Sequence, residues 1–131
     1  MARALHHLDL WVSDLTTASG EWEWILGELL WEADRPGESG WSWVHPDGTY
    51  FFLERSPDQL DEPHDRMRPG INHLALTCED RPTLDRMRAE SSSHGWHEMY
   101  ADRYPHAGGE NHTALYLENS EGFEVEIVLG D

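Results

Sequence analysis

A histidine opens the same short phrase at two places in the chain. The copies are residues 7–14, HLDLWVSD, and residues 73–80, HLALTCED. In each copy an alternating stretch follows the histidine, and an aspartate closes it just where a helical pattern begins. An imidazole can bind a metal or move a proton, and it can equally be a hydrogen-bonded structural residue. Because the phrase returns after about half the chain, it indicates an internal duplication into two similar modules that pack as a pair.

The length of 131 residues leaves room for one compact domain, because either half alone would be only marginally stable. We therefore expect a single domain over residues 1–131, with modules at about 4–55 and 70–130. The intervening segment, residues 56–70, is rich in proline and charge and is typical of a polar connector. The single cysteine, Cys78, fits a reducing compartment. Without a long apolar run, we expect a cytoplasmic protein that does not enter a membrane.

Charge is the strongest compositional bias of the chain. The sequence has 26 acidic residues against 9 Lys and Arg residues, a formal net charge of −17 with histidines neutral. Nucleic-acid binding depends largely on cations that contact phosphates, so this balance argues against it and against polyanionic substrates. A negative field instead favours cationic or neutral ligands. Solubility alone is the simpler explanation of the acidity.

Hydrophobic periodicity predicts the same order of elements in both halves. In the first half we expect a strand, a helix and three strands over residues 7–12, 15–29, 30–33, 40–45 and 49–54. In the second half we expect the same order over residues 71–78, 82–95, 96–101, 113–118 and 123–129. Each half is thus predicted to be a βαβββ module, and the fold class is predicted to be α+β.

These features resemble the vicinal oxygen chelate superfamily, which includes glyoxalase I, extradiol dioxygenases and bleomycin-resistance proteins. The resemblance rests on the two opening phrases, on the helix end Ile25-Leu26-Gly27 and on the closing phrase LENSEGFEVE at residues 117–126. It implies a cup-shaped mixed sheet with the helices outside and the ligand or metal inside. It also implies a homodimer, since members often build each cavity from modules of two chains. The reaction stays open, because this fold hosts several chemistries and simple binding.

The resemblance also implies metal ligands at the opening histidine of each module and at a glutamate after the final turn. Those positions here hold His7, His73 and Glu126. Two imidazoles and one carboxylate suit a single divalent ion of Fe, Mn, Ni or Zn and leave positions open for substrate or water. The alternative is that no cofactor is bound. The histidines would then be structural, and Glu126 would belong to a solvated acidic run.

Some relatives have a fourth ligand, which comes from the equivalent strand of the first module. Alignment of Gly48 with Gly122 puts Phe52 at that position, and phenylalanine cannot bind a metal. Glu54 lies two residues further along the same strand face and is a candidate replacement. The absence of a carboxylate at position 52 favours binding over metal chemistry.

Aromatic residues of the first module could form a binding wall. Trp11 has the same strand parity as His7 and is expected to point into the implied cup. Trp43, Tyr50 and Phe52 alternate along strands of the same module and could line the same wall. An aromatic concave surface in a negative field suits a flat aromatic or cationic molecule. The alternative is that these rings form an aromatic core.

A glycine-rich loop over residues 102–112 precedes the last two strands. Its glycines suggest close backbone approach or mobility, because no strand-to-helix context for a phosphate cradle surrounds them. His106 and His112 lie in or beside this loop, where the mouth of the cavity is expected. They are therefore candidate ligand-binding residues, although loop histidines are more often solvated.

Two functions from different classes follow from these observations. The preferred one is an antibiotic-resistance type of binding protein that sequesters a bulky aromatic natural product, such as a bleomycin- or enediyne-like compound. The alternative is a divalent-metal enzyme, either a lyase, an isomerase or an extradiol-type dioxygenase, that acts on a substrate with vicinal oxygens. Metal chelation distinguishes them, because it should leave sequestration intact and abolish catalysis.

Overall fold

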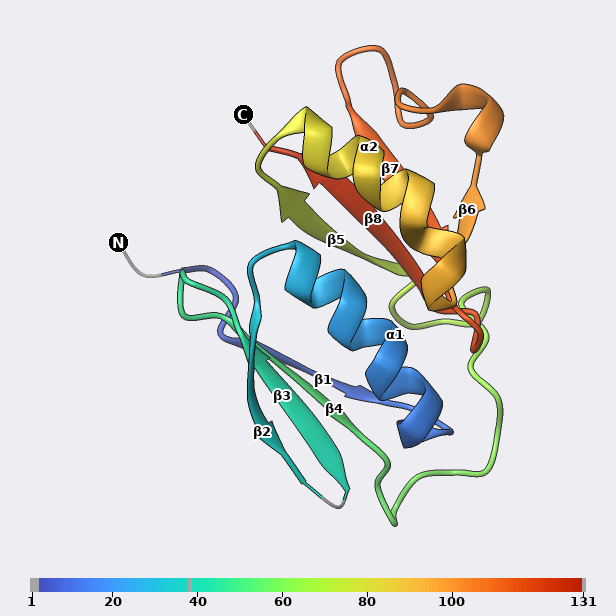
Figure 1. Cartoon of the computed structure of the whole chain (residues 1–131). Helices are drawn as coiled ribbons and strands as arrows, with labels where there is room; N and C mark the ends of the chain where they lie inside the picture. Colours follow the sequence, from blue (N-terminus) through green and yellow to red (C-terminus); the bar gives the residue numbers. More distant parts are fainter. Residues whose placement is uncertain (1–2, 38, 131) are drawn as a thin grey trace. The chain divides into compact units, whose positions relative to one another are not determined.

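The computed structural model describes residues 3–37 and 39–130 and divides into two compact units. Unit 1 extends to Pro63 and unit 2 begins at His64, so the division falls inside the segment predicted to be a connector. Each unit contains one four-stranded sheet and one α-helix (Figure 1). This architecture confirms the α+β class and the βαβββ order of both modules. Among the described residues, no helix has the length and apolar character needed to cross a bilayer.

Unit 1 has a mixed sheet in the strand order β1-β4-β3-β2. Its elements are β1 (His7–Trp11), α1 (Leu15–Glu28), β2 (Glu32–Pro36), β3 (Gly40–Val44) and β4 (Tyr50–Glu54). β1 runs parallel to β4, and the other neighbouring strands are antiparallel. α1 begins where the Asp14 carboxylate accepts the Thr17 backbone N–H at 3.2 Å, which satisfies a donor that the helix itself cannot pair.

The core of unit 1 lies between α1 and one face of its sheet. Trp22 and Ile25 come from the helix, and Trp43, Phe51 and Leu53 come from the sheet. Each of these side chains is at most 1% exposed. The spacing of three and four residues along α1 and the alternation along β4 therefore bring the apolar side chains of both elements to one interface.

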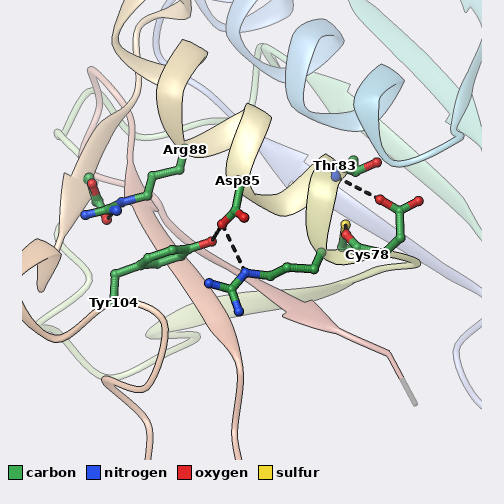
Figure 2. Close-up of polar contacts among 8 residues, drawn as sticks. Cys78, Thr83, Asp85, Arg88 and Tyr104 are labelled. Carbon is green, nitrogen blue, oxygen red and sulfur yellow. Dashed lines mark hydrogen bonds and ion pairs between the residues drawn. The ribbon is translucent and has the colours of Figure 1, made fainter.

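Unit 2 repeats this plan in the strand order β5-β8-β7-β6. Its elements are β5 (His73–Cys78), α2 (Arg81–Glu90), η1 (Ser91–His94), β6 (His97–Met99), η2 (Ala101–Arg103), β7 (Ala114–Glu118) and β8 (Glu124–Leu129), where η denotes a 3-10 helix. β5 runs parallel to β8, as β1 does to β4. Asp80 caps α2 by accepting the Thr83 backbone N–H at 2.8 Å (Figure 2).

The core of unit 2 lies under α2. Leu84 and Met87 from the helix and Leu115 and Ile127 from the sheet are fully buried. Cys78, at the end of β5, is 1% exposed, and its thiol donates to the Asp80 backbone oxygen at 3.3 Å (Figure 2). Burial raises the pKa of the Cys78 thiol, so this cysteine is an unreactive core residue.

Three element boundaries differ from those predicted. The strand expected over residues 30–33 is β2 at 32–36, because Leu30 has a positive φ of 74° and turns the chain after α1. The helix expected over residues 82–95 is α2 followed by η1, and Gly95 ends it with a φ of 86° that glycine adopts without steric cost. The strand expected over residues 96–101 is shortened to β6 at 97–99, because the chain then enters η2.

Candidate functional site

Three strands of unit 2 place polar side chains on the sheet face opposite α2. His73 on β5 pairs with Glu124 on β8, and Tyr116 on β7 pairs with Glu126. Directly paired residues share a face, as do positions two apart on one strand, so these side chains project together. Along β8, Val125 and Ile127 project toward α2, whereas Glu124 and Glu126 project to the other face. Glu124 and Glu126 are nevertheless only 6% and 7% exposed.

Two histidines hold the buried carboxylate of Glu126. Its Oε1 lies 3.4 Å from His73 Nε2, and its Oε2 lies 2.5 Å from His112 Nε2. His73 comes from β5, whereas His112 comes from the loop that precedes β7. A buried carboxylate needs hydrogen bonds or a nearby cation, and within the described part of the chain no arginine pairs with Glu126. His112 therefore supplies a hydrogen bond that the buried carboxylate needs, whereas the contact with His73 depends on the tautomer of that ring.

The Asn72 side chain determines which nitrogen of His73 carries a proton. Its amide nitrogen donates to the Arg66 backbone oxygen at 3.1 Å, and its amide oxygen therefore faces His73 Nδ1 at 2.9 Å. Because that oxygen can only accept, Nδ1 donates, and a neutral imidazole then has its lone pair on Nε2. His73 Nε2 and Glu126 Oε1 are thus two acceptors that face each other. Only a proton or a metal ion between them satisfies both.

The facing pair fits part of a metal site. Two ligands at about 2.0–2.2 Å from one ion in tetrahedral or octahedral geometry lie roughly 2.8–3.6 Å apart. His73 Nε2 and Glu126 Oε1 are 3.4 Å apart, and the bond from His73 to Asn72 is the outer support that metal-binding histidines usually have. Within the described residues, no group of three His, Cys, Asp or Glu side chains is gathered to hold an ion. The third predicted ligand, His7, belongs to unit 1.

The Tyr116 hydroxyl belongs to the same cluster. Burial and the negative charge of Glu126 raise the pKa of Tyr116, so its hydroxyl keeps its proton at neutral pH. The backbone at Gly108 approaches this hydroxyl closely. A Cβ at Gly108 would lie 2.6 Å from the Tyr116 oxygen and 2.6 Å from His112 Cδ2. The loop therefore closes over the cluster only because residue 108 has no side chain, which confirms the close backbone approach predicted for it.

The two histidines predicted at the cavity mouth have different surroundings. His112 is half-buried and bonds Glu126, as described above. His106 is exposed, and its Nδ1 lies 3.2 Å from the His112 backbone oxygen. His106 thus supports the loop that carries His112, and its own contact with a ligand stays a prediction.

An open cavity of about 380 Å³ is lined by this cluster. Its lining residues all belong to unit 2 and include His73, Glu126, Tyr116, Tyr100, Arg66 and Arg103. Volumes of this order hold a small organic molecule. The cavity is polar and carries both signs of charge, so its ligand is expected to be polar as well.

Unit 1 carries a different set of side chains on the equivalent sheet face. β1 and β4 pair in the same register as β5 and β8, so Tyr50 and Phe52 occupy the positions of Glu124 and Glu126. This register confirms the position of Phe52 that the turn glycines predicted. The His7 ring stacks on Tyr50 with ring centroids 4.6 Å apart and an interplanar angle of 5°. The face is therefore aromatic where that of unit 2 is acidic.

Glu54, the candidate fourth ligand, lies on this aromatic face and is bound by its neighbours. Its Oε1 accepts the Trp11 Nε1–H at 2.9 Å. Partial burial and the adjacent Asp9 raise the pKa of Glu54. The Trp11 ring remains 44% exposed, so it stays available to a ligand while its indole nitrogen is paired.

Trp43 does not lie on the aromatic face. It pairs with Phe51 across β3 and β4, is 1% exposed, and meets the Phe51 ring edge-on at 6.3 Å between centroids. Tyr50 and Phe52 have the opposite parity on β4 and therefore project away from α1. The prediction that Trp43 lines a ligand-binding wall is wrong, because this side chain is part of the core. Alternation within one strand does not reveal which parity faces the helix.

Sequence reasoning missed several residues of the unit 2 cavity. Tyr116 and Asn72 had weak signals, since Tyr116 alternates with the acidic residue at 118 and Asn72 directly precedes His73. Arg103 had none, because it lies in an irregular segment whose placement depends on contacts with α2. These three side chains nevertheless line the cavity.

Comparisons with known proteins agree with this architecture. A family model of the glyoxalase/bleomycin resistance protein/dioxygenase superfamily matches residues 6–116. The chain is 35% identical over 125 residues to the uncharacterized protein YqjT of Bacillus subtilis (strain 168), with 95% of this chain and 97% of that protein covered. It matches the crystal structure of a candidate glyoxalase from Bacillus halodurans at a TM-score of 0.89 and 34% identity, covering 97% of this chain and 96% of that one.

A more distant structure, the lactoylglutathione lyase of Agrobacterium tumefaciens, shares the fold at a TM-score of 0.65 and 15% identity, covering 97% of this chain and 93% of that one. At this identity the likeness concerns the fold alone. The family match and the two Bacillus relatives carry the assignment, since each spans most of the chain. The chain therefore belongs to the glyoxalase/bleomycin resistance protein/dioxygenase superfamily.

Proposed function

We propose that the chain is a divalent-metal enzyme of the glyoxalase or dioxygenase type that acts on a small substrate with vicinal oxygens. The observation that carries this proposal is the pair of facing acceptors, His73 Nε2 and Glu126 Oε1, at 3.4 Å in the unit 2 cavity. A face that served packing alone would not need a buried carboxylate opposite an imidazole lone pair. The cavity, of about 380 Å³, has room for a small substrate.

His73 and Glu126 would hold the metal ion, with His7 of unit 1 as the predicted third ligand. Two imidazole nitrogens and one carboxylate oxygen suit Fe, Mn, Ni or Zn. Such an ion, when bound, polarises substrate oxygens as a Lewis acid. Asn72 keeps His73 in the tautomer and orientation that binding requires.

Other residues of the cluster would control protons and the positions of the polar side chains. His112 would donate its Nε2–H to Glu126 Oε2, which satisfies that oxygen and leaves Oε1 facing His73. The Tyr116 hydroxyl, whose pKa is raised, keeps its proton beside Glu126 and would exchange its hydrogen bond to that carboxylate for one to a substrate oxygen. The close approach of the Gly108 backbone would limit the movement of both side chains.

Metal content is the first test of this proposal. The chain would be purified without chelators and compared with His73→Ala and with His97→Ala, which removes an exposed histidine of β6 as a matched control. We expect near one ion of Fe, Mn, Ni or Zn per chain in the wild type and in His97→Ala, and a loss in His73→Ala. Turnover of catechol and of a 2-oxoaldehyde–thiol adduct should disappear after EDTA treatment. A wild type that binds none of these ions would contradict the proposal.

The aromatic face of unit 1 favours a second candidate function, sequestration of an aromatic natural product. Tyr50 and Phe52 share this face with Trp11, which is 44% exposed. Each stacking contact contributes roughly 0.5–1.5 kcal/mol beyond burial. Titration of bleomycin into EDTA-treated protein should then quench indole emission, and Trp11→Ala should weaken binding while Leu30→Ala, which trims another exposed apolar side chain, should not. Equal binding by both variants would contradict this candidate.

A homodimer is also part of the proposal. Large apolar side chains are strongly exposed in and beside the segment between the modules, namely Leu60, Met67 and Ile71. Exposed apolar groups of this size often mark a contact with another chain. Light scattering coupled to size-exclusion chromatography should give twice the chain mass of 15.1 kDa, and a monomer at all concentrations would contradict it.

A further inference from the structure

Of the two arginines that line the unit 2 cavity, Arg103 has no ion-pair partner among the described residues. Arg66 Nη1 pairs with Glu124 Oε1 at 3.2 Å, and the other buried carboxylate, Glu126, is held by histidines. Arg103 lines the same cavity, and none of the described carboxylates lies within ion-pair distance of its guanidinium. The chain has 26 acidic and only 9 Lys and Arg residues. Arg103 is exposed at the open cavity, so water solvates its guanidinium and an anionic ligand entering the cavity can replace that water.

The backbone that carries Arg103 is fixed on α2 through the neighbouring Tyr104 (Figure 2). The Tyr104 hydroxyl donates to Asp85 Oδ1 at 2.7 Å, and the Arg88 guanidinium lies 4.2 Å from the centroid of the Tyr104 ring. Arg88 Nη2 also donates to the Ala101 backbone oxygen at 3.3 Å. Contacts on both sides of Arg103 thus anchor the η2 segment. The guanidinium is presented from a fixed support, which lowers the entropy lost when it binds a ligand.

Tyr100 links Arg103 to the polar cluster. Its backbone is in the left-handed region, with φ 59° and ψ 36°, which is strained for a residue other than glycine. In this conformation its ring lies 5.0 Å from the Arg103 guanidinium and meets the Tyr116 ring edge-on at 5.5 Å between centroids. The cavity wall therefore presents, one after another, the Arg103 guanidinium, the rings of Tyr100 and Tyr116, and the Glu126 carboxylate. A planar molecule with an anionic end matches this sequence of groups.

We propose that Arg103 binds a carboxylate group of the substrate, so that the unit 2 cavity selects small planar carboxylic acids. A guanidinium recognises a carboxylate through paired hydrogen bonds, and the tyrosine rings offer a surface against which a planar body can lie. The other end of the molecule then reaches Glu126 and Tyr116. The role of the ligand's other end, which would react near Glu126, rests on the proposed function, whereas the Arg103 anchor does not. The net charge of the chain predicted a cationic or neutral ligand, whereas Arg103 would bind an anionic one. The contact with Arg103 outweighs the field of the distant acidic residues, because that field is screened by salt.

Binding of benzoate and benzamide to the EDTA-treated full chain tests this inference. The two probes have nearly the same shape and differ in charge, and neither has vicinal oxygens, so neither is a substrate of the proposed reaction. Chelation removes any metal that could bind the carboxylate instead. Isothermal titration calorimetry should give a Kd for benzoate at least about tenfold lower than that for benzamide, as expected for a hydrogen-bonded charge pair. Equal Kd values would overturn the inference.

Two arginine variants with the same change of net charge make the test specific. Arg103→Gln removes the proposed anchor, whereas Arg86→Gln removes an exposed arginine of α2 outside the cavity lining. We expect Arg103→Gln to abolish the preference for benzoate, Arg86→Gln to keep it, and Arg103→Lys to keep part of it, since lysine retains the charge but not the planar fork. An equal loss in both Gln variants would overturn the inference. If protein purified without chelators binds no metal ion and yet prefers benzoate, the proposed reaction is refuted while the Arg103 anchor stands.

Discussion

Units 1 and 2 share one backbone plan and carry opposite kinds of sheet face. At two equivalent positions beside the strand-opening histidine, unit 1 has Tyr50 and Phe52, and unit 2 has Glu124 and Glu126. In unit 1 the histidine ring stacks on a tyrosine, whereas in unit 2 it faces a carboxylate. The shared register fixes where the side chains project, and the residue type alone decides whether these positions present aromatic rings or carboxylates. A duplicated fold can therefore present different side-chain chemistry on equivalent faces without a change of topology.

The residue before each histidine refines this comparison. His6 Nδ1 lies 2.9 Å from His7 Nδ1, and Asn72 Oδ1 lies 2.9 Å from His73 Nδ1. A ring nitrogen can be donor or acceptor, so His6 leaves the tautomer of His7 open. An amide oxygen only accepts, so Asn72 fixes the tautomer of His73. The tautomer of the strand-opening histidine is thus fixed in unit 2 and left open in unit 1.

The largest effect is expected from Glu126→Gln, which replaces the carboxylate at the centre of the unit 2 polar cluster with an amide of nearly the same shape. We expect a loss of bound metal and a fall in kcat/KM of about 10²–10⁴-fold, because the Lewis acid contributes several kcal/mol to transition-state stabilisation. Phe52→Leu changes the equivalent position of unit 1 and is the matched control, with metal content retained. If Glu126→Gln kept both metal and turnover, the acidic face would not be the reacting one.

The second prediction separates core from binding surface within unit 1. Trp43→Ala should lower the free energy of unfolding by about 3–5 kcal/mol, because Trp43 is 1% exposed and its loss leaves a cavity. Trp11→Ala should lower it by clearly less than Trp43→Ala does, because that ring is 44% exposed and its loss removes one hydrogen bond to Glu54 without leaving a closed cavity. Urea denaturation followed by far-UV circular dichroism measures both. Similar values for the two variants would contradict the assignment of Trp43 to the core.

Local sequence patterns predicted the fold because hydrophobic alternation, capping residues and turn glycines act over short distances. The turn glycines predicted that Phe52 occupies the position in unit 1 that Glu126 occupies in unit 2, and the register confirms this equivalence. The error at Trp43 arose because the face that a helix covers is set by packing between elements. Arg103 was out of reach for a related reason: its place depends on contacts of Tyr104 and Ala101 with α2, which no periodicity encodes.

The third prediction concerns the support of His73. Asn72→Leu should lower metal affinity by about 10–100-fold, because the leucine side chain cannot accept the Nδ1 proton. Asn72→Asp is the rescue variant, since it keeps an acceptor oxygen beside Nδ1. Competition with a fluorescent zinc indicator measures both affinities. Equal affinities in Asn72→Leu and the wild type would show that the Asn72 contact does not organise the ligand.

The smallest effect concerns a feature that the units share, the aspartate caps of their helices. Backbone and side-chain hydrogen bonds from Thr17 and Thr83 hold the pKa values of Asp14 and Asp80 below the ordinary value of 3.8. Each cap therefore contributes stability that is present above pH 3.8 and is lost as the pH falls through the depressed pKa of the folded state. Asp14→Ala and Asp80→Ala should lower Tm slightly at neutral pH, and the difference from wild type should shrink in acid. A deficit that grew in acid would contradict this assignment.

Tryptophan and cysteine are unevenly distributed between the units, so the unfolding of each unit can be followed by its own probe. Of the seven tryptophans, only Trp96 belongs to unit 2, so indole emission follows mainly unit 1. The sole thiol, Cys78, is sealed beneath α2 in unit 2. A thiol reagent can react with it only when that helix lifts from its sheet, so the labelling rate measures the opening of unit 2. Emission and labelling recorded on one unmodified sample would therefore show whether the two halves unfold in a single step or in succession.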